Sequence, residues 1–157
     1  MAMTWAEVKG KIRDLGFEED ATMDEYSDIV IHSVNRSLDM IYNEVIQPNE
    51  EYFVNLLSTW GNVTNPFTQE TSYKIVSKWV MNPPTHVNDD TEDDFEMEIP
   101  DKCVYILPVL ASYYVWLDDD ERKAVYYWNQ WETWKANFEN EIRGRNYRVT
   151  MYGGLWF

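Results

Sequence analysis

The residues that most often carry enzyme chemistry are few and scattered in this chain. His32 and His86 are the only two histidines, and neither belongs to an HExxH-type pair that would hold zinc. The single cysteine, Cys103, lies in the apolar run CVYIL and lacks the electropositive setting that lowers the pKa of a thiol. One cysteine excludes a disulfide within the chain and a CxxC zinc or redox motif, so Cys103 is predicted to be a small core residue.

Carboxylates are abundant, but their spacing selects no reaction. The run DDTEDD at residues 89–94 offers the hard oxygen ligands that calcium prefers, yet it lacks the ligand spacing and the turn glycine of an EF-hand. We interpret it as a solvated loop. The scattered glycines form no phosphate-binding loop of the GxGxxG or GxxxxGK[ST] type. The sequence therefore predicts a protein that is not an enzyme, with no catalytic residue, no metal site and no cofactor.

Charge and aromatic content together favour a protein that binds other proteins. The formal charge of −15 argues against binding nucleic acid through phosphates, which requires clustered Lys and Arg. Aromatic residues make up 16% of the chain and include eight tryptophans, an excess that suits protein interfaces. The chain shows no signal-peptide pattern, and the apolar run at 103–117 is short for a membrane span. We therefore expect a soluble protein made in the cytoplasm.

An aromatic pair of helices, at 101–143, organises the chain. The first, around CVYILPVLASYYVWL, is apolar on every side and must be covered by other elements, and Pro108 predicts a kink or a late start. The second carries its apolar residues at steps of three and four, and the acidic corner at 118–121 is expected to form the turn and cap this helix. The predicted buried stripe consists of Ala124, Trp128, Trp131, Lys135, Phe138 and Ile142, widened by Tyr127 and Trp134.

The N-terminal half also reads as helical. Thr4 and Glu7 match a capping box, and Gly16 offers a stop. A second capping box at 22–25 predicts a long helix whose apolar stripe extends to Val45. Helical spacing continues over 50–60, although that segment is short and a turn signal follows at 61–62.

A period of two replaces the helical period between residues 71 and 99. Residues 71–80 and 95–99 alternate, and we expect them to pair as a two-stranded antiparallel ribbon joined by a projecting acidic connection. The sequence thus predicts a mainly α fold, a helical bundle with a small antiparallel β-ribbon. We expect one helical domain at 1–143, with the ribbon inserted at about 71–99, followed by an extended C-terminal interaction tail at 144–157.

This tail is the strongest candidate for a binding site. After Gly144 the sequence RNYRVTMYGGLWF alternates and then ends in three large apolar residues, which would be awkward in water. The tail either folds back on its own core or fills a pocket on another subunit or partner, and we favour the second. The partner-binding candidates are Arg145, Tyr147, Arg148, Tyr152, Leu155, Trp156 and Phe157.

Two stretches resemble the head–tail adaptor proteins of tailed bacteriophages. The first contains Val34-Asn35-Arg36-Ser37-Leu38 and Ile41-Tyr42-Asn43-Glu44, similar to a family pattern of the type AVNRALxxIYxE. The second contains Ala111-Ser112-Tyr113-Tyr114-Val115-Trp116-Leu117 and Lys123-Ala124-Val125-Tyr126-Tyr127, similar to YaAYYLWLxDDxxKAxYY. With the same order of helices and strands, the resemblance spans most of the chain.

The resemblance implies a structural protein of the virion neck, at the head–tail interface. Such adaptors form a homo-oligomeric ring, commonly a dodecamer, that joins the portal protein to a tail or neck protein and lines the DNA exit channel. An acidic channel repels phosphates, so DNA would pass without specific binding. Asn35 and Arg36, on the polar side of the long helix, become candidates for subunit contacts. The alternative is a small soluble enzyme or ligand-binding regulatory protein that uses the aromatic helical hairpin as a pocket.

Overall fold

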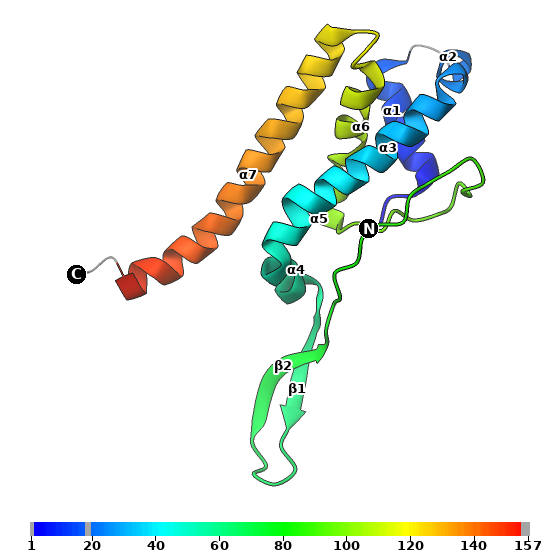
Figure 1. The fold of residues 1–157 in the computed structure, drawn as a ribbon. Helices are drawn as coiled ribbons and strands as arrows, with labels where there is room; N and C mark the ends of the chain where they lie inside the picture. The colour runs from blue at the N-terminus through cyan, green and yellow to red at the C-terminus, as the bar shows by residue number, and fades with distance from the viewer. Residues whose placement is uncertain (1, 18–19, 155–157) are drawn as a thin grey trace.

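The protein is mainly α-helical with one small antiparallel sheet, as predicted (Figure 1). The computed structural model describes the backbone of residues 2–17 and 20–154 and the side chains of residues 2–17 and 23–143. The elements in chain order are α1 (Trp5–Gly16), α2 (Asp20–Glu25), α3 (Ser27–Ile41), a π-helical turn (Tyr42–Ile46), a 3-10 turn (Gln47–Asn49), α4 (Glu50–Leu57), β1 (Thr59–Thr64), β2 (Thr71–Ser77), α5 (Asp101–Val104), α6 (Leu107–Trp116) and α7 (Glu121–Gly154).

Helix α6 forms the centre of the core. It packs against α1, α3 and α7, which confirms that this apolar helix must be covered on most sides (Figure 1). Pro108 lies in its first turn, after a short α5, so the late start is also confirmed. Within the described residues, no helix combines the length and the apolar content needed to cross a membrane.

The stripe predicted on α7 faces the core: Trp128 packs against Tyr113 of α6, with ring centroids 4.8 Å apart, and Phe138 packs against Phe53 of α4 at 5.7 Å. Ala124, Trp131 and Phe138 are fully or nearly fully buried, and Trp134 stacks on Phe138 with ring centroids 5.3 Å apart. The acidic corner is a turn, and Asp120 caps α7 by accepting a bond from the backbone N–H of Lys123 at 3.3 Å. The predicted hairpin is therefore confirmed over residues 101–143.

The end of α1 fits against α6 and α7 because residue 16 is glycine. A Cβ at Gly16 would lie 2.3 Å from Nε1 of Trp116, so any larger residue would displace the indole ring. Lys123 covers the same site: its ammonium group donates to the Gly16 carbonyl at 3.1 Å and lies 4.2 Å from the Trp116 ring centroid. The hydroxyl of Tyr127 donates to the carbonyl of Leu15. The helix stop predicted at Gly16 is confirmed.

The long N-terminal helix is divided into shorter pieces. Tyr26 has non-helical dihedrals (φ −102°, ψ 14°) and separates α2 from α3. The prediction of one continuous helix from the second capping box is therefore wrong. At the other end, the π-helical and 3-10 turns place Pro48 where its missing N–H is tolerated and lead directly into α4. Helix α4 confirms the helix predicted over 50–60 as far as Leu57.

The structure confirms one of the two predicted strands and replaces the other. β2 lies within the predicted strand 71–80, but it pairs with β1 and not with 95–99. β1 begins in the last two residues of the segment predicted as helix and continues through 61–62, so the turn predicted there is wrong. The β1–β2 loop spans 65–70 and is much shorter than the connection from 82 to 94, so its closure costs less entropy. Of residues 95–99, Glu96 alone makes a bridge, to Thr4. The ribbon therefore occupies 59–77.

Helix α7 also differs from the prediction. The sequence places its end near Gly144, whereas the helical backbone continues through that glycine to Gly154. A glycine inside a helix costs only about 1 kcal/mol relative to alanine, and no proline follows it to stop the helix. The backbone of 144–154 is thus helical instead of extended. Residues 155–157, the last three of the predicted tail, lie outside the described residues.

Candidate interaction surfaces

The structure shows the surroundings of the cysteine and of the carboxylates considered above for chemistry. Cys103 is fully buried, and burial raises the pKa of its thiol to about 12, so the reactive thiolate is suppressed. This confirms its assignment as a core residue. Among the described residues, no three His, Cys, Asp or Glu side chains gather closely enough to hold a metal ion.

The alternative function would place a pocket at the aromatic hairpin, but one sizeable hollow among the described residues lies away from the hairpin. It has a volume of about 660 Å³ and lies between α1, the residues around the start of α3, and the connection at 88–93. Trp5, Met23, Val30 and Ile31 supply apolar lining, while three aspartates and two basic residues supply charge. A smaller hollow at the hairpin, of about 280 Å³, is lined by Lys102, Trp134, Asn137, Phe138 and Glu141.

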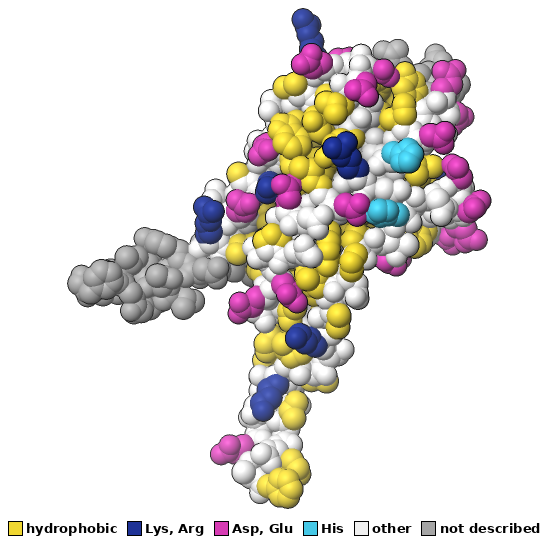
Figure 2. Space-filling model, in the orientation of Figure 1, with side chains coloured by type: hydrophobic (Ala, Val, Ile, Leu, Met, Phe, Trp, Pro, Cys, Tyr) yellow, Lys and Arg dark blue, Asp and Glu magenta, His cyan; other side chains and the backbone are white. Residues whose placement is uncertain are grey.

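The most exposed apolar surface of the described residues is the β-ribbon. Figures 1 and 2 show it as an arm that projects from the helices, with apolar side chains along it and at its tip. Both strands are exposed along nearly their whole length. Natural two-stranded ribbons are marginally stable unless a surface packs on them, so an uncovered apolar ribbon indicates a binding surface. The exposed apolar residues of this arm are Trp60, Val63, Phe67, Tyr73, Val76 and Val80.

The tip of the ribbon holds its most exposed apolar residue, Phe67, at 93% exposure. Asn65 orders the turn, because its side-chain oxygen accepts from the backbone N–H of Phe67 at 2.9 Å and its carbonyl accepts from Gln69 at 2.9 Å. Gln69 has φ of 62°, the one positive φ among described non-glycine residues. The turn thus presents an aromatic ring on an ordered backbone.

The base of the ribbon is fixed to the helical body. The backbone N–H of Trp79 donates to the hydroxyl of Ser58 at 2.9 Å, and the indole N–H of Trp60 donates to the carbonyl of Asn55 at 2.9 Å. Trp79 also packs against Phe53 of α4, with ring centroids 6.4 Å apart. These contacts hold the start of the arm in a defined direction relative to α4.

The ribbon also differs from the body in charge. The ribbon together with the three residues that follow it, 59–80, contains one acid, Glu70, and two bases, Lys74 and Lys78, so this arm has a formal charge of +1. Because the whole chain carries −15, the remaining residues carry −16. The arm is therefore a nearly neutral, apolar projection on a strongly acidic protein.

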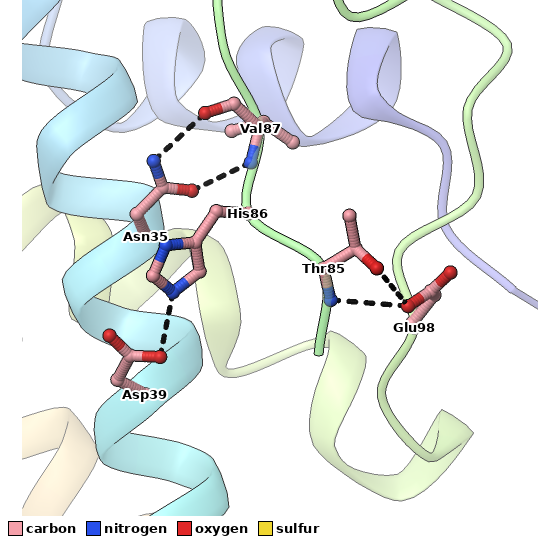
Figure 3. A network of polar contacts seen from close by, with 6 residues as sticks. All are labelled: Asn35, Asp39, Thr85, His86, Val87 and Glu98. Atoms are coloured by element: carbon pink, nitrogen blue, oxygen red, sulfur yellow. Dashed lines mark hydrogen bonds and ion pairs between the residues drawn. The ribbon is translucent and has the colours of Figure 1, made fainter. Parts of the chain in front are cut away.

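The acidic connection, predicted to project, is bound to the body. The Asn35 side chain forms two hydrogen bonds with the backbone of Val87, one to its N–H and one to its carbonyl, both 2.8 Å long (Figure 3). Next to it, Nε2 of His86 lies 2.7 Å from a carboxylate oxygen of Asp39. Further along, the Thr85 hydroxyl donates to Glu98 at 2.6 Å.

The N-terminus holds the other end of this connection. The backbone N–H of Trp5 donates to the carbonyl of Phe95 at 2.8 Å, and Lys9 pairs with Asp93 at 2.7 Å.

The two predicted subunit-contact residues therefore have roles inside this chain. Asn35 fastens the connection to α3. Arg36 is exposed, and its guanidinium carbon lies 4.6 Å from the ring centroid of Tyr114 on α6. The Tyr114 hydroxyl donates to the sulfur of Met40 at 3.0 Å, and burial raises the pKa of this tyrosine although Arg36 opposes the shift. Arg36 keeps an exposed side that a second subunit can contact, whereas Asn35 is engaged.

The predicted tail residues lie at and beyond the end of the described side chains. The backbone of Arg145, Tyr147, Arg148 and Tyr152 belongs to the last part of α7, while their side chains and the residues Leu155, Trp156 and Phe157 lie outside the described residues. Their partner-binding role stays a prediction.

Sequence reasoning missed the exposed ribbon residues, above all Phe67. A signal was present: Asn65-Pro66 is a turn dipeptide, and the residues on either side have β-forming side chains. Recognising that turn would have paired 71–77 with the preceding segment. Comparisons of this chain with models of known protein families, with curated proteins and with solved structures find no match.

Proposed function

We propose that this protein is a structural connector that assembles into a ring at the head–tail interface of a tailed bacteriophage, between the portal and a tail or neck protein. The observation that carries the proposal is the contrast between an acidic helical body and an apolar, nearly neutral arm that projects from it. A subunit of an assembly needs an exposed apolar surface to bury against its neighbour, and this arm offers one.

The charge of the body suits the surface of a DNA channel. Copies of a protein with a formal charge of −15 present a strongly negative surface to the space they enclose. Such a surface repels DNA phosphates, so the genome moves through without binding. The same charge makes the copies repel one another, so specific apolar contacts are required to hold the ring together.

The C-terminal part of the chain is proposed to bind the portal. Helix α7 leads away from the other helices toward the C-terminus (Figure 1), and this direction supports a binding role for the residues after 143. The candidates Arg145, Tyr147, Arg148 and Tyr152, with Leu155-Trp156-Phe157 at the end, supply cationic and aromatic anchors of the kind that dominate interfaces. In this proposal the protein belongs to the virion and has no enzymatic role.

The mass of the purified chain, measured by native mass spectrometry with and without the portal protein of the same virus, tests this function. We expect a closed oligomer, with twelve copies as the leading expectation, on the portal. A variant lacking residues 155–157 should stay folded but lose portal binding. A chain that remains monomeric and unbound at micromolar portal concentrations would contradict the proposal.

A further inference from the structure

We infer that the tip of the β-ribbon docks into the hollow between α1, α3 and the acidic connection of a second copy of this chain. The inference rests on the proposed ring, because it identifies the contact that joins neighbouring subunits. Two separate features of one chain carry it: an ordered aromatic tip that no other described residue covers, and a hollow lined by both apolar and charged side chains.

The chain's own tip cannot reach its own hollow. The hollow is lined by Ser27, Val30 and Ile31 from the first turns of α3, whereas the ribbon begins after α4, beyond the opposite end of α3 (Figure 1). Helix α3 has 15 residues, which corresponds to about 22 Å at 1.5 Å per residue. The ribbon then continues away from the helices, which increases the separation. The occupant must come from another molecule.

The size and lining of the hollow suit the tip. A volume of about 660 Å³ has room for the Phe67 ring together with part of its turn. The rings and aliphatic groups of Trp5, Met23 and Val30 offer apolar contacts. Phe67 is flanked by the uncharged Pro66 and Thr68, and the one charged residue of the turn, Glu70, lies at its end beside β2. Burying this ring removes from water the most exposed large apolar side chain of the described residues.

Charge selects a copy of the same chain as the partner. Lys74 lies three residues along the strand from the first residue of β2, about 10 Å from the turn at 3.3 Å per residue. When the tip is inserted, Lys74 comes near the hollow, whose lining includes the carboxylates of Asp24, Asp89 and Asp93. Lys9 and Arg13 also line the hollow; Lys9 is paired with Asp93, and Arg13 lies 3.5 Å from Asp14. The arm at 59–80, of charge +1, is attracted to a body of charge −16, whereas two bodies repel each other.

The contact is heterologous, because the ribbon of one copy meets a different surface of the next. Contacts of this type produce a ring when the rotation between neighbours closes, and a filament when it does not. Each copy gives one tip and receives one, so no tip and no hollow is left unfilled in a closed ring. The proposed contact therefore explains how a strongly acidic subunit overcomes its own repulsion.

The first experiment compares Phe67→Ser with Tyr105→Ser by the mass of the assembly over a range of protein concentrations, with portal present. Tyr105 is the matched control, because it is an aromatic residue of 69% exposure outside the ribbon. We expect Phe67→Ser to weaken subunit association about tenfold or more, and Tyr105→Ser to leave it unchanged. Equal assembly of the Phe67→Ser variant and the natural chain would overturn the inference.

The second experiment identifies the receiving surface by mixing chains that carry single new cysteines. A Phe67→Cys chain is mixed with a differently tagged Ser27→Cys chain, and Asn129→Cys on the exposed side of α7 replaces Ser27→Cys in the control. The native Cys103 is buried and stays unreactive. We expect a disulfide between differently tagged chains for the Ser27 pair and none for the Asn129 pair. Equal yields from both pairs, or none from either in an intact assembly, would overturn the inference.

These experiments separate the inference from the proposed function. If the chain assembles and binds portal but Phe67→Ser changes neither, the adaptor function stands and the ribbon contact is wrong. If the chain associates through Phe67 but ignores the portal at every concentration, the contact stands and the adaptor function is wrong. A chain that never associates contradicts both.

Discussion

Phe53 and Phe67 lie fourteen positions apart and have opposite surroundings. Phe53, on α4, is fully buried and packs against Tyr52, Trp79 and Phe138. Phe67, at the ribbon tip, is 93% exposed. The same side chain therefore stabilises the fold in one region and is held in water in the other. This difference separates residues that fold the chain from residues available to a partner.

The two regions also hold their shape by different means. The core relies on stacked rings and on helices that cover α6 from several sides. The ribbon relies on its turn, on the hydrogen bonds at its base, and on cross-strand pairs such as Trp60 and Tyr73, whose centroids are 5.8 Å apart. Truncating an aromatic side chain in the core should therefore destabilise the fold. Truncating one in the ribbon should leave the fold stable but weaken assembly.

The largest difference is expected between Phe53→Ala and Phe67→Ala. Removing the buried ring leaves a cavity among three aromatic neighbours and should lower the free energy of unfolding by about 3–5 kcal/mol. Removing the exposed ring should change it by less than about 0.5 kcal/mol. Urea unfolding followed by tryptophan fluorescence measures both. Similar losses for the two variants would show that the ribbon is part of the folding core.

The buried thiol gives the second prediction. Burial raises the pKa of Cys103 from 9.0 to about 12, so the folded state holds this proton more tightly than the unfolded chain. The resulting stability is complete below pH 9 and is lost as pH rises from 9 toward 12, by about 2 kcal/mol at pH 10.5. The unfolding free energies of the natural chain and of Cys103→Ala should be measured over this pH range. The value for the natural chain should fall toward that of the variant as pH rises, because the variant has no thiol to lose this contribution.

An exposed cysteine in the ribbon provides the contrast. In a Cys103→Ala background, Ser72→Cys places a thiol on β2, where Ser72 is exposed. At pH 8 this thiol should react with iodoacetamide within the usual time for a free cysteine, while Cys103 in the natural chain should react only after urea is added. Rapid labelling of native Cys103 would contradict its burial.

The connection at 82–99 gives the third prediction. Asn35→Ala removes both hydrogen bonds to Val87 and leaves a half-buried backbone segment without its partner, at a cost of about 1–3 kcal/mol. Asn43→Ala, at an exposed position after α3, is the matched control and should cost less than about 0.5 kcal/mol. Thermal unfolding measures the two losses. Equal effects would mean that the connection contributes nothing to folding.

Much of the helical core could be predicted because its signals are local. The capping box of Thr4 and Glu7 and the stripe on α7 depend on neighbouring residues in the chain, and both are present in the structure. The late start at Pro108 follows from the chemistry of that residue alone. Where the local pattern agrees with the tertiary packing, the prediction is right.

The ribbon and the connection could not be predicted in the same way. The alternation at 71–77 indicates a strand but does not name its partner, and only the Asn65-Pro66 turn and the shorter loop favour β1 over 95–99. The bonds between Asn35 and Val87 join residues 52 positions apart, with no sequence pattern to indicate them. The exposure of Phe67 is likewise a consequence of where the ribbon points. The candidate site could be found only from the structure.

The smallest effect is expected inside the ribbon. Trp60→Ala removes the stacked pair with Tyr73 and the hydrogen bond to the Asn55 carbonyl, interactions that order the arm without burying it. A cross-strand aromatic pair contributes about 0.5–1.5 kcal/mol, and most of that should be lost locally. Amide hydrogen exchange should speed up in β1 and β2 while α6 keeps its protection. If exchange in α6 rises equally, the ribbon and the core unfold as one unit and the distinction between them fails. If only the ribbon responds, the arm is an independently ordered element, available to a neighbour without a cost to the fold.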